Sequence, residues 1–112
     1  ENKPKKIEKL KGVSINTIIN DSPFQNKKIN LLSIDIENYE FEALKEFNFD
    51  KYNIDVIVSE VTDLDSSELK LYNNSLEKII NSKIYDLLTK NNYKLINWVN
   101  SDLVFVNKKS KF

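Results

Sequence analysis

A chain of 112 residues is long enough for one domain with one modest core. Its 17 lysines balance its 17 acidic residues, so no net charge steers it to nucleic acid or to a membrane surface. Cysteine and histidine are both absent, which excludes disulfides, thiol nucleophiles, Ser-His-Asp triads and zinc sites built on these residues.

No apolar run approaches the roughly 20 residues of a membrane-spanning helix, and no signal-peptide pattern opens the sequence. We therefore expect a cytoplasmic protein with no membrane partner. The sequence contains no methionine and begins with Glu1. This beginning indicates a piece of a longer protein, and processing of the N-terminus is the alternative.

Residues 1–12 form a lysine-rich N-terminal segment. No aromatic residue lies between the lysines, and the sequence has no arginine, whereas nucleic-acid interfaces usually combine basic with aromatic side chains. We interpret the segment as a solvated tail or connector with no nucleic-acid partner. The next residues predict a short strand at Val13 and Ile15, followed by a helical turn with Ile15, Ile18 and Ile19 on one face.

An apolar run over residues 29–36 predicts a buried parallel strand. From Asn38 the apolar residues recur with helical spacing, which predicts a helix of about three turns that Glu37 or Asn38 caps. We expect Phe41, Leu44 and Phe47 on its inner face, and Glu40, Glu42, Lys45 and Glu46 on its outer face. Residues 48–53 have the composition of a polar, aromatic loop.

A second β-branched run over residues 54–61 predicts another buried parallel strand, paired with the first. Residues 62–74 are polar and predict an ordered loop with a helical turn. The clearest helical periodicity then runs from a cap at Ser75 to a left-handed end at residues 91–92. These elements alternate as in an α/β fold.

Residues 93–99 and 103–106 are rich in β-branched and aromatic side chains, with a polar turn between them. They predict a closing antiparallel hairpin. Residues 108–112 form a polar tail. The fold class is therefore α/β, with parallel strands and a C-terminal antiparallel hairpin.

The stretch from Leu32 to Glu40 reads Leu-Ser-Ile-Asp-Ile-Glu-Asn-Tyr-Glu, and Ala-Leu-Lys follows at residues 43–45. It resembles the strand-and-helix signature of FkbM-type methyltransferases, whose pattern is roughly Lys-Ile-Asp-Val-Glu-Gly-x-Glu followed by Val-Leu-Lys. Members of that family are S-adenosylmethionine-dependent O-methyltransferases with a Rossmann-like fold. Ser33 stands where the family usually has lysine, and Asn38 where it usually has glycine.

The resemblance covers about residues 13–107 and implies the second half of a Rossmann-like class I methyltransferase fold. The first half of such a fold carries the glycine-rich turn and the acidic residue that bind the cofactor. Because Gly12 is the sole glycine, this chain has no such turn and no cofactor-binding residue to assign. We expect S-adenosylmethionine to be the cofactor of the complete domain, and the isolated chain to be inactive.

The resemblance also implies the site residues. Asp35 and Glu37 lie two apart, which places them on one face of an ideal strand. The family pattern gives them catalytic roles: one acts as a general base or orients a hydroxyl, and the other caps the helix or binds a cation. Glu60 ends the next strand and would line the same crevice for substrate. Tyr39 would stack on a sugar or pack in the core.

In the family's sheet order, the strand at 29–36 has its second neighbour in the first half of the domain. Its free edge would carry four apolar residues, namely Leu31, Leu32, Ile34 and Ile36. Exposed apolar edges tend to pair with another chain. We therefore expect either a missing N-terminal half or a homodimer joined at this edge.

The sequence thus predicts part of an O-methyltransferase whose small-molecule partner offers a hydroxyl, on a sugar or another compound. Methyl transfer depends more on alignment than on acid–base strength, which suits a chain without histidine. One alternative is a non-catalytic α/β interaction module, or an inactive remnant, that dimerises through the open edge. A second is a Mg²⁺-dependent phosphoesterase or nuclease built on Asp35, Glu37 and Glu60, although our main interpretation assigns no metal.

Overall fold

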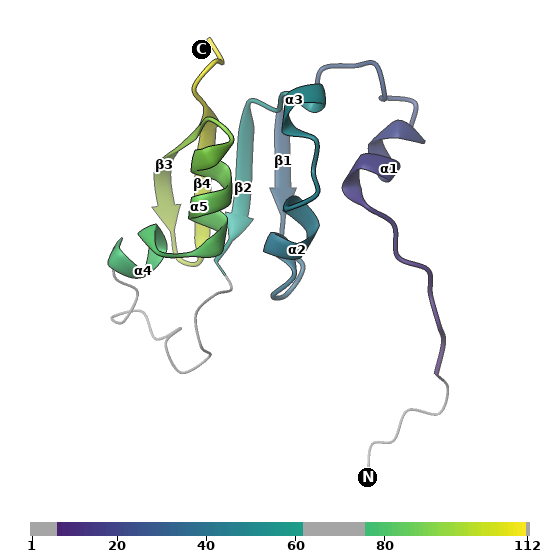
Figure 1. Ribbon diagram of the computed structural model, residues 1–112, viewed down its shortest axis with the longest axis horizontal. Coiled ribbons are helices and arrows are strands. Elements are labelled where there is room, and N and C mark those ends of the chain that lie inside the picture. The colour runs from purple at the N-terminus through teal and green to yellow at the C-terminus, as the bar shows by residue number, and fades with distance from the viewer. Residues whose placement is uncertain (1–6, 62–75, 112) are drawn as a thin grey trace.

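Short helices and strands alternate along the chain in the computed structural model, which describes residues 7–61 and 76–111 (Figure 1). In chain order they are α1 (Ile15–Asn20), β1 (Leu31–Ile34), α2 (Glu40–Leu44), α3 (Phe49–Tyr52), β2 (Val56–Glu60), α4 (Leu76–Ile80), α5 (Lys83–Lys90), β3 (Tyr93–Val99) and β4 (Asp102–Asn107). No helix in this part of the chain is long and apolar enough to cross a membrane.

The four strands form one mixed sheet in the order β1-β2-β4-β3. β1 and β2 are parallel, with Leu31 opposite Val56, and β4 is antiparallel to both β2 and β3. The left-handed backbone of Asn100, with φ of 55°, makes the turn between β3 and β4. The predicted parallel pair and the closing hairpin are therefore confirmed, although both parallel strands are shorter than predicted.

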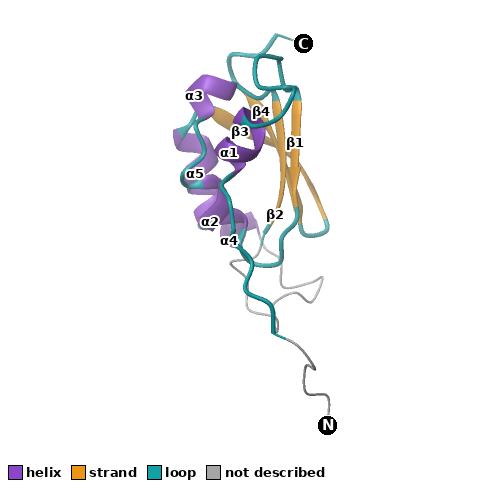
Figure 2. Ribbon diagram, turned by 90° about the vertical axis from the view of Figure 1, so that its right-hand side faces the viewer, coloured by secondary structure: helices purple, strands orange, loops and turns teal. Residues whose placement is uncertain are grey.

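The helices lie on one side of the sheet, as Figure 2 shows. Alternate strand residues point into this helix layer, which places Ile57, Leu103 and Phe105 in the core with no exposed surface. Leu44 of α2 and Leu88 of α5 join the same core. The alternating residues that point the other way are less covered, and they include Val56, Val58 and Val104.

The segment predicted as a loop at residues 48–53 contains a one-turn helix, α3. The Asn48 side chain accepts a hydrogen bond from the Lys51 amide at 3.0 Å, and Asn53 ends the turn with φ of 45°. Phe47 stacks on Tyr52 with ring centroids 5.3 Å apart, and both are buried. A helix of four residues is too short to show a helical period in the sequence. The sequence pattern therefore could not predict α3.

α2 is shorter than the helix predicted from residue 38. Glu37 and Asn38 adopt left-handed backbone angles, with φ of 51° and 77°, so the helix begins only at Glu40. The predicted cap by Glu37 or Asn38 is wrong, because Tyr39 occupies the N-cap position and no side chain caps the helix. The predicted outward orientation of Glu40 is also wrong, since this side chain is fully buried.

The long helix predicted up to residues 91–92 is divided into α4 and α5. Ser82 causes the break, because its hydroxyl donates to the Ile79 carbonyl at 2.7 Å and accepts from the Tyr85 amide at 3.2 Å. Asn92 has φ of 68°, which confirms the predicted left-handed end. The predicted cap at Ser75 and the loop at 62–74 lie outside the described residues.

The strand predicted at Val13 and Ile15 is absent from the described N-terminal residues. Ser14 instead caps α1 by accepting a hydrogen bond from the Thr17 amide at 3.2 Å. α1 then lies beside β1, on the helix side of the sheet (Figures 1 and 2).

Candidate active site at the ends of β1 and β2

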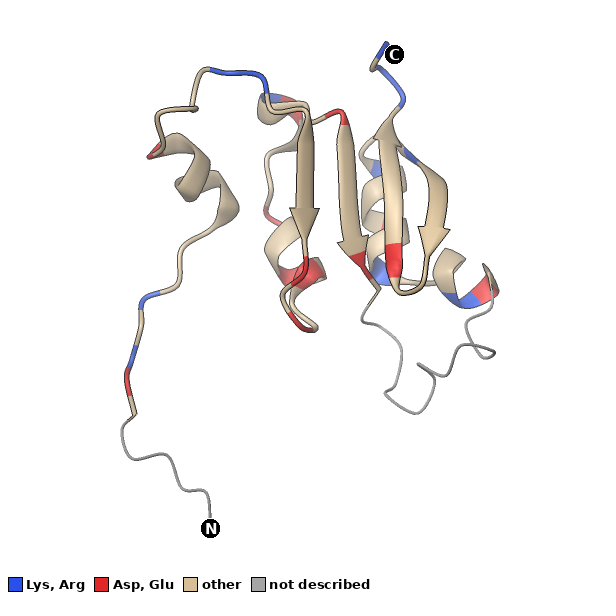
Figure 3. Ribbon diagram, turned by 180° about the vertical axis from the view of Figure 1, so that it is seen from behind, with Lys and Arg blue, Asp and Glu red and all other residues tan. Residues whose placement is uncertain are grey.

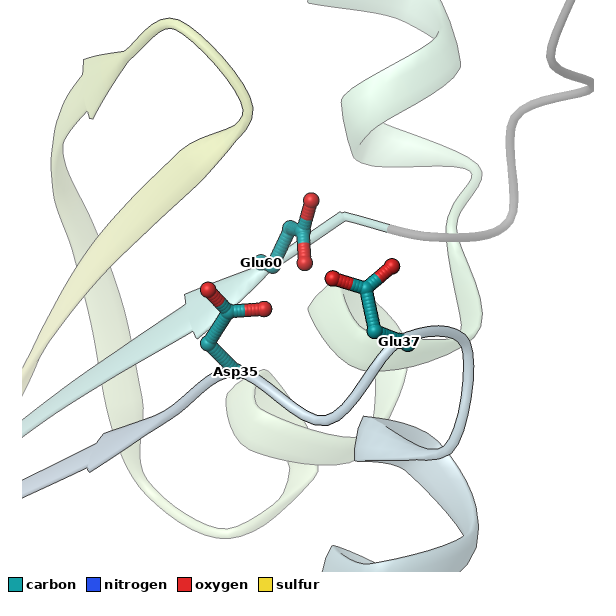
Figure 4. Close-up of side chains that lie close together, drawn as sticks. All are labelled: Asp35, Glu37 and Glu60. Carbon is teal, nitrogen blue, oxygen red and sulfur yellow. The ribbon is translucent and has the colours of Figure 1, made fainter.

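Three acidic side chains meet where β1 and β2 end. Asp35 follows β1 directly, and Glu60 is the last residue of β2. Because the carboxyl ends of parallel strands lie at the same edge of a sheet, the two side chains come together. With Glu37 they bring one carboxylate oxygen each to within 4.8 Å of one another, and Figure 4 shows the three side chains facing a common space.

The approach of Glu37 depends on the turn after β1, not on a strand. β1 ends at Ile34, so Asp35 and Glu37 both lie beyond it and do not share a strand face as predicted. The left-handed angles of Glu37 and Asn38 instead reverse the chain and direct Glu37 back toward Glu60 (Figure 4). A left-handed angle costs a non-glycine residue about 1 kcal/mol, so this turn carries strain at the site.

Glu40 supports this turn from beneath. Its side chain is fully buried at the start of α2, and its Oε1 accepts a hydrogen bond from the Ile36 amide at 2.8 Å. Ile36 lies between Asp35 and Glu37, so this bond positions both neighbours. Periodicity missed the residue, but the last Glu of the quoted family signature falls on it.

Glu60 holds its proton more tightly than an ordinary glutamate at this end of the sheet, where Figure 3 shows acidic residues gathered. A hydrogen bond to Asp35 raises the pKa of Glu60 to about 7, and burial and the charges of Asp35, Glu40 and Glu37 act in the same direction. Glu60 Oε2 is buried and has no hydrogen-bond partner in the described part of the chain. The site can therefore exchange a proton near neutral pH, or bind a group that satisfies this oxygen.

The three carboxylates also form an oxygen-rich donor set. Hard cations such as Mg²⁺ and Ca²⁺ prefer carboxylate oxygens, and Asp35, Glu37 and Glu60 each offer one within the same small space. Asp102 of β4 lies opposite Glu60 and adds negative charge at the same end of the sheet. These residues could hold a divalent cation.

Tyr39 follows Glu37 by two residues and is 65% exposed, so the alternative that it packs in the core is wrong. Its ring is free to contact a bound molecule. Ser33 and Asn38, which depart from the family signature, are both exposed. Asn38 adopts the left-handed angle that glycine would otherwise supply.

No curated protein and no solved structure matches the chain. The family model described as "Methyltransferase FkbM domain" matches residues 2–95. This range contains β1, β2 and all three carboxylates of the cluster. The match covers most of the 112 residues, and the chain therefore belongs to the FkbM methyltransferase domain family.

Proposed function

We propose that the chain is the acceptor-side half of an S-adenosylmethionine-dependent O-methyltransferase domain, acting on a hydroxyl of a sugar or another small molecule. The observation that carries this proposal is the meeting of Asp35, Glu37 and Glu60 at the strand ends, in a member of a methyltransferase family. Ligands of open α/β sheets bind in the crevice at this end. The acceptor hydroxyl would therefore lie against these carboxylates.

Two features support a half-domain of Rossmann-like type. The parallel pair β1–β2 continues into the antiparallel hairpin, and β1 forms one border of the described sheet. Sheets of this type usually carry helices on both faces, whereas the described helices all lie on one (Figure 2). A further segment would pair with the free edge of β1 and would cover the sheet face that carries Val56, Val58 and Val104.

The residues present do not fit the cofactor by themselves. The sole glycine, Gly12, lies in open space, because a Cβ built on it would meet no other part of the described chain within 4 Å. It also precedes helix α1 and does not follow a strand. The chain thus lacks the glycine-rich turn on which such folds bind their cofactor. The cofactor would bind mainly to the part of the domain that this chain does not include.

The chemistry of this chain then concerns the acceptor alone. With a pKa of about 7, Glu60 is partly ionised at neutral pH and can accept the proton that an attacking hydroxyl loses. Asp35 and Glu37 can accept hydrogen bonds from the same hydroxyl or its neighbours, which fixes its orientation. Glu40 acts through the Ile36 amide and is a positioning residue.

A second candidate function is Mg²⁺-dependent phosphoester hydrolysis, which the donor set of Asp35, Glu37 and Glu60 favours. A non-catalytic or inactive α/β module that pairs through β1 is the third, and the open edge supports it. The three candidates differ in what they bind: a sulfonium cofactor and an alcohol, a divalent cation, or only another polypeptide.

Calorimetric titration of S-adenosylmethionine tests the main proposal. We expect no binding to the 112-residue chain and micromolar to millimolar binding to a chain extended upstream in its own reading frame. In the extended chain, Glu60→Gln should retain cofactor binding and lose methyl transfer, whereas Glu77→Gln on exposed α4 should retain both. Failure of the extended chain to bind the cofactor would overturn the proposal.

A further inference from the structure

The charges of this neutral chain are separated along the direction of the strands. The acidic cluster of Asp35, Glu37 and Glu60 lies where β1 and β2 end. Exposed lysines gather at the opposite end of the sheet, in the turns that precede β1 and follow β4, as Figure 3 shows. A net charge of zero therefore conceals one acidic end and one basic end. Charged surfaces of this kind attract partners of opposite charge.

The basic end unites two segments that are distant in the sequence. Residues 24–28 precede β1, and residues 107–111 include the end of β4 and the turn after it. Asp55 joins them, because Lys28 Nζ lies 3.1 Å from Asp55 Oδ1 and the Ser110 hydroxyl donates to the same oxygen. The two segments together form a basic patch, which we define by Lys27, Lys28, Lys108, Lys109 and Lys111.

The lysines after β4 belong to a turn that the backbone holds in place. The Lys108 amide donates to the Asn92 carbonyl at 2.8 Å. The Lys109 amide donates to Asn107 Oδ1 at 2.9 Å. Asn107 is buried, and its Nδ2 donates to Asn53 Oδ1 at 2.9 Å. These bonds fix the points at which the lysine side chains leave the fold, which reduces the entropy lost when a partner binds.

Most lysines of the basic patch are available to a partner. Lys28 is the exception, because it pairs with Asp55. Phe24 adds an aromatic ring to the patch, since it is 58% exposed and its ring centroid lies 5.5 Å from Lys27 Nζ. The remaining lysines are exposed and form no ion pair with the described residues, namely Lys27, Lys108, Lys109 and Lys111.

We propose that the basic patch binds the phosphate backbone of a single-stranded nucleic acid. The four exposed lysines contact phosphates, and a base stacks on Phe24. Arginine, the side chain that most often reads base edges, is absent from the chain, so the binding is independent of base sequence. This proposal differs from the expectation of no nucleic-acid partner, because that expectation considered only the net charge and residues 1–12. It does not depend on methyl transfer and is tested separately from it.

A membrane surface fits the basic patch less well than a nucleic acid does. Membrane-binding surfaces insert several apolar side chains beside their lysines. Within residues 24–28 and 107–111, Phe24 is the only exposed large apolar side chain that the structure describes. The other exposed neighbours of Lys27 are the amide side chains Gln25 and Asn26. Amides of this kind form hydrogen bonds with phosphates, sugars and bases.

The acidic end of a second copy also fits less well. Its three carboxylates, from Asp35, Glu37 and Glu60, bring their oxygens within 4.8 Å of one another. Lysines that are distributed over two segments cannot all reach so small a group. A nucleic-acid strand instead carries one negative charge on each nucleotide, and its planar bases can lie on the ring of Phe24.

Fluorescence anisotropy with a labelled oligouridylate of about 20 nucleotides measures binding to the 112-residue chain. We expect binding at low salt that weakens as the salt concentration rises. A plot of log affinity against log salt concentration should have a slope of about −3, because each of four phosphate contacts contributes about −0.7 for a single strand. Oligoadenylate of the same length should bind with nearly the same affinity.

Paired variants separate the basic patch from the other lysines. Lys108→Gln combined with Lys109→Gln should weaken binding at low salt by roughly fivefold or more and reduce the magnitude of the slope by about 1.4. The matched control, Lys9→Gln combined with Lys11→Gln, removes the same charge from exposed positions in the N-terminal segment and should do neither. Phe24→Ala should weaken binding by roughly fivefold and leave the slope unchanged, because stacking releases no counterions.

Three results would overturn the proposal. The first is that the chain does not bind oligouridylate at low salt, whether or not it sediments with vesicles of phosphatidylserine and phosphatidylcholine. The second is that the control pair weakens binding as much as the pair at Lys108 and Lys109. The third is a salt-sensitive dimer in light scattering that the pair at Lys108 and Lys109 dissociates.

Discussion

Asp35 directly follows β1, Glu60 ends the neighbouring parallel strand β2, and a hydrogen bond between them raises the pKa of Glu60 to about 7. The negative charge of Asp35 and the partial burial of Glu60 also disfavour ionisation of Glu60. The pair therefore holds a proton near neutral pH. This proton links the chemistry of the site to the stability of the fold.

The first prediction concerns Glu60→Gln. The folded pKa of Glu60 is about 7, above the ordinary value of 4.5, so the protonated form contributes stability that is lost as the pH rises from about 4.5 through 7. A neutral glutamine avoids this loss. We expect the variant to be more stable than the wild type at pH 8, by on the order of 1–2 kcal/mol after allowance for partial exposure.

Urea denaturation at several pH values measures this effect. The difference in the free energy of unfolding between the variant and the wild type should vanish below pH 4.5, where Glu60 and the glutamine that replaces it are both neutral. Glu77→Gln, on the exposed surface of α4, serves as the control and should show no such pH dependence. A difference that is constant across the pH range would contradict the shared proton.

The second prediction concerns divalent cations, and it separates the metal-dependent candidate from the other two. If Asp35, Glu37 and Glu60 bind Mg²⁺, millimolar Mg²⁺ at pH 8 should raise the thermal midpoint of the wild type, because a ligand that binds only the folded state stabilises it. Asp35→Asn should remove most of the increase. An equal shift in both chains would mean a general salt effect.

The third prediction concerns the buried support of the turn. Glu40→Ala leaves the Ile36 amide without its acceptor, so we expect a loss of about 1–3 kcal/mol in the free energy of unfolding. Glu42→Ala lies on the same helix, but its side chain is about half exposed, at 52%, and should cost much less. Glu40→Gln keeps an acceptor oxygen and should recover part of the loss. Equal effects of the two alanine variants would argue against a supporting role.

The fourth prediction concerns the strained turn at Glu37. Glycine adopts the left-handed angle of 51° without steric cost, so Glu37→Gly should stabilise the fold by about 1 kcal/mol. The same change in the helix, Glu42→Gly, should destabilise it by about 1 kcal/mol. Because Glu37→Gly also removes a carboxylate from the cluster, the extended chain should lose activity while gaining stability. Chemical denaturation measures the expected gain in stability, and a methyl-transfer assay measures the expected loss of activity.

The fifth prediction lies at the other end of the sheet. Hydrogen bonds from Ser110, Asn30 and Lys28 lower the pKa of Asp55 to about 2. A depressed pKa contributes stability that is present above the ordinary value of 3.8 and is lost as the pH falls toward 2. Asp55→Asn should therefore destabilise the chain at pH 7 and match the wild type near pH 2. Asp21→Asn, at an exposed helix end, is the control.

Much of the architecture could be predicted from the sequence alone. Apolar runs around Ile34 and Ile57 identified the two parallel strands, because parallel strands of α/β sheets typically have nearly continuous apolar sequences. The polar turn around Asn100 identified the hairpin. The same patterns placed Asp35 and Glu60 at strand ends, and parallel strands bring their ends to one edge of the sheet.

Only the tertiary structure decided the details that make the site. Glu40 looked exposed by helical spacing, yet it is buried because the turn before α2 needs an acceptor for the Ile36 amide. Glu37 reaches the cluster through a left-handed turn that no period predicts. The position of α1 beside β1 depends on hydrogen bonds that Asn16 and Tyr52 make across distant parts of the sequence. Local sequence patterns indicate which residues are apolar enough to be buried. Hydrogen bonds between polar groups that are distant in the sequence determine how the elements that carry the site are placed.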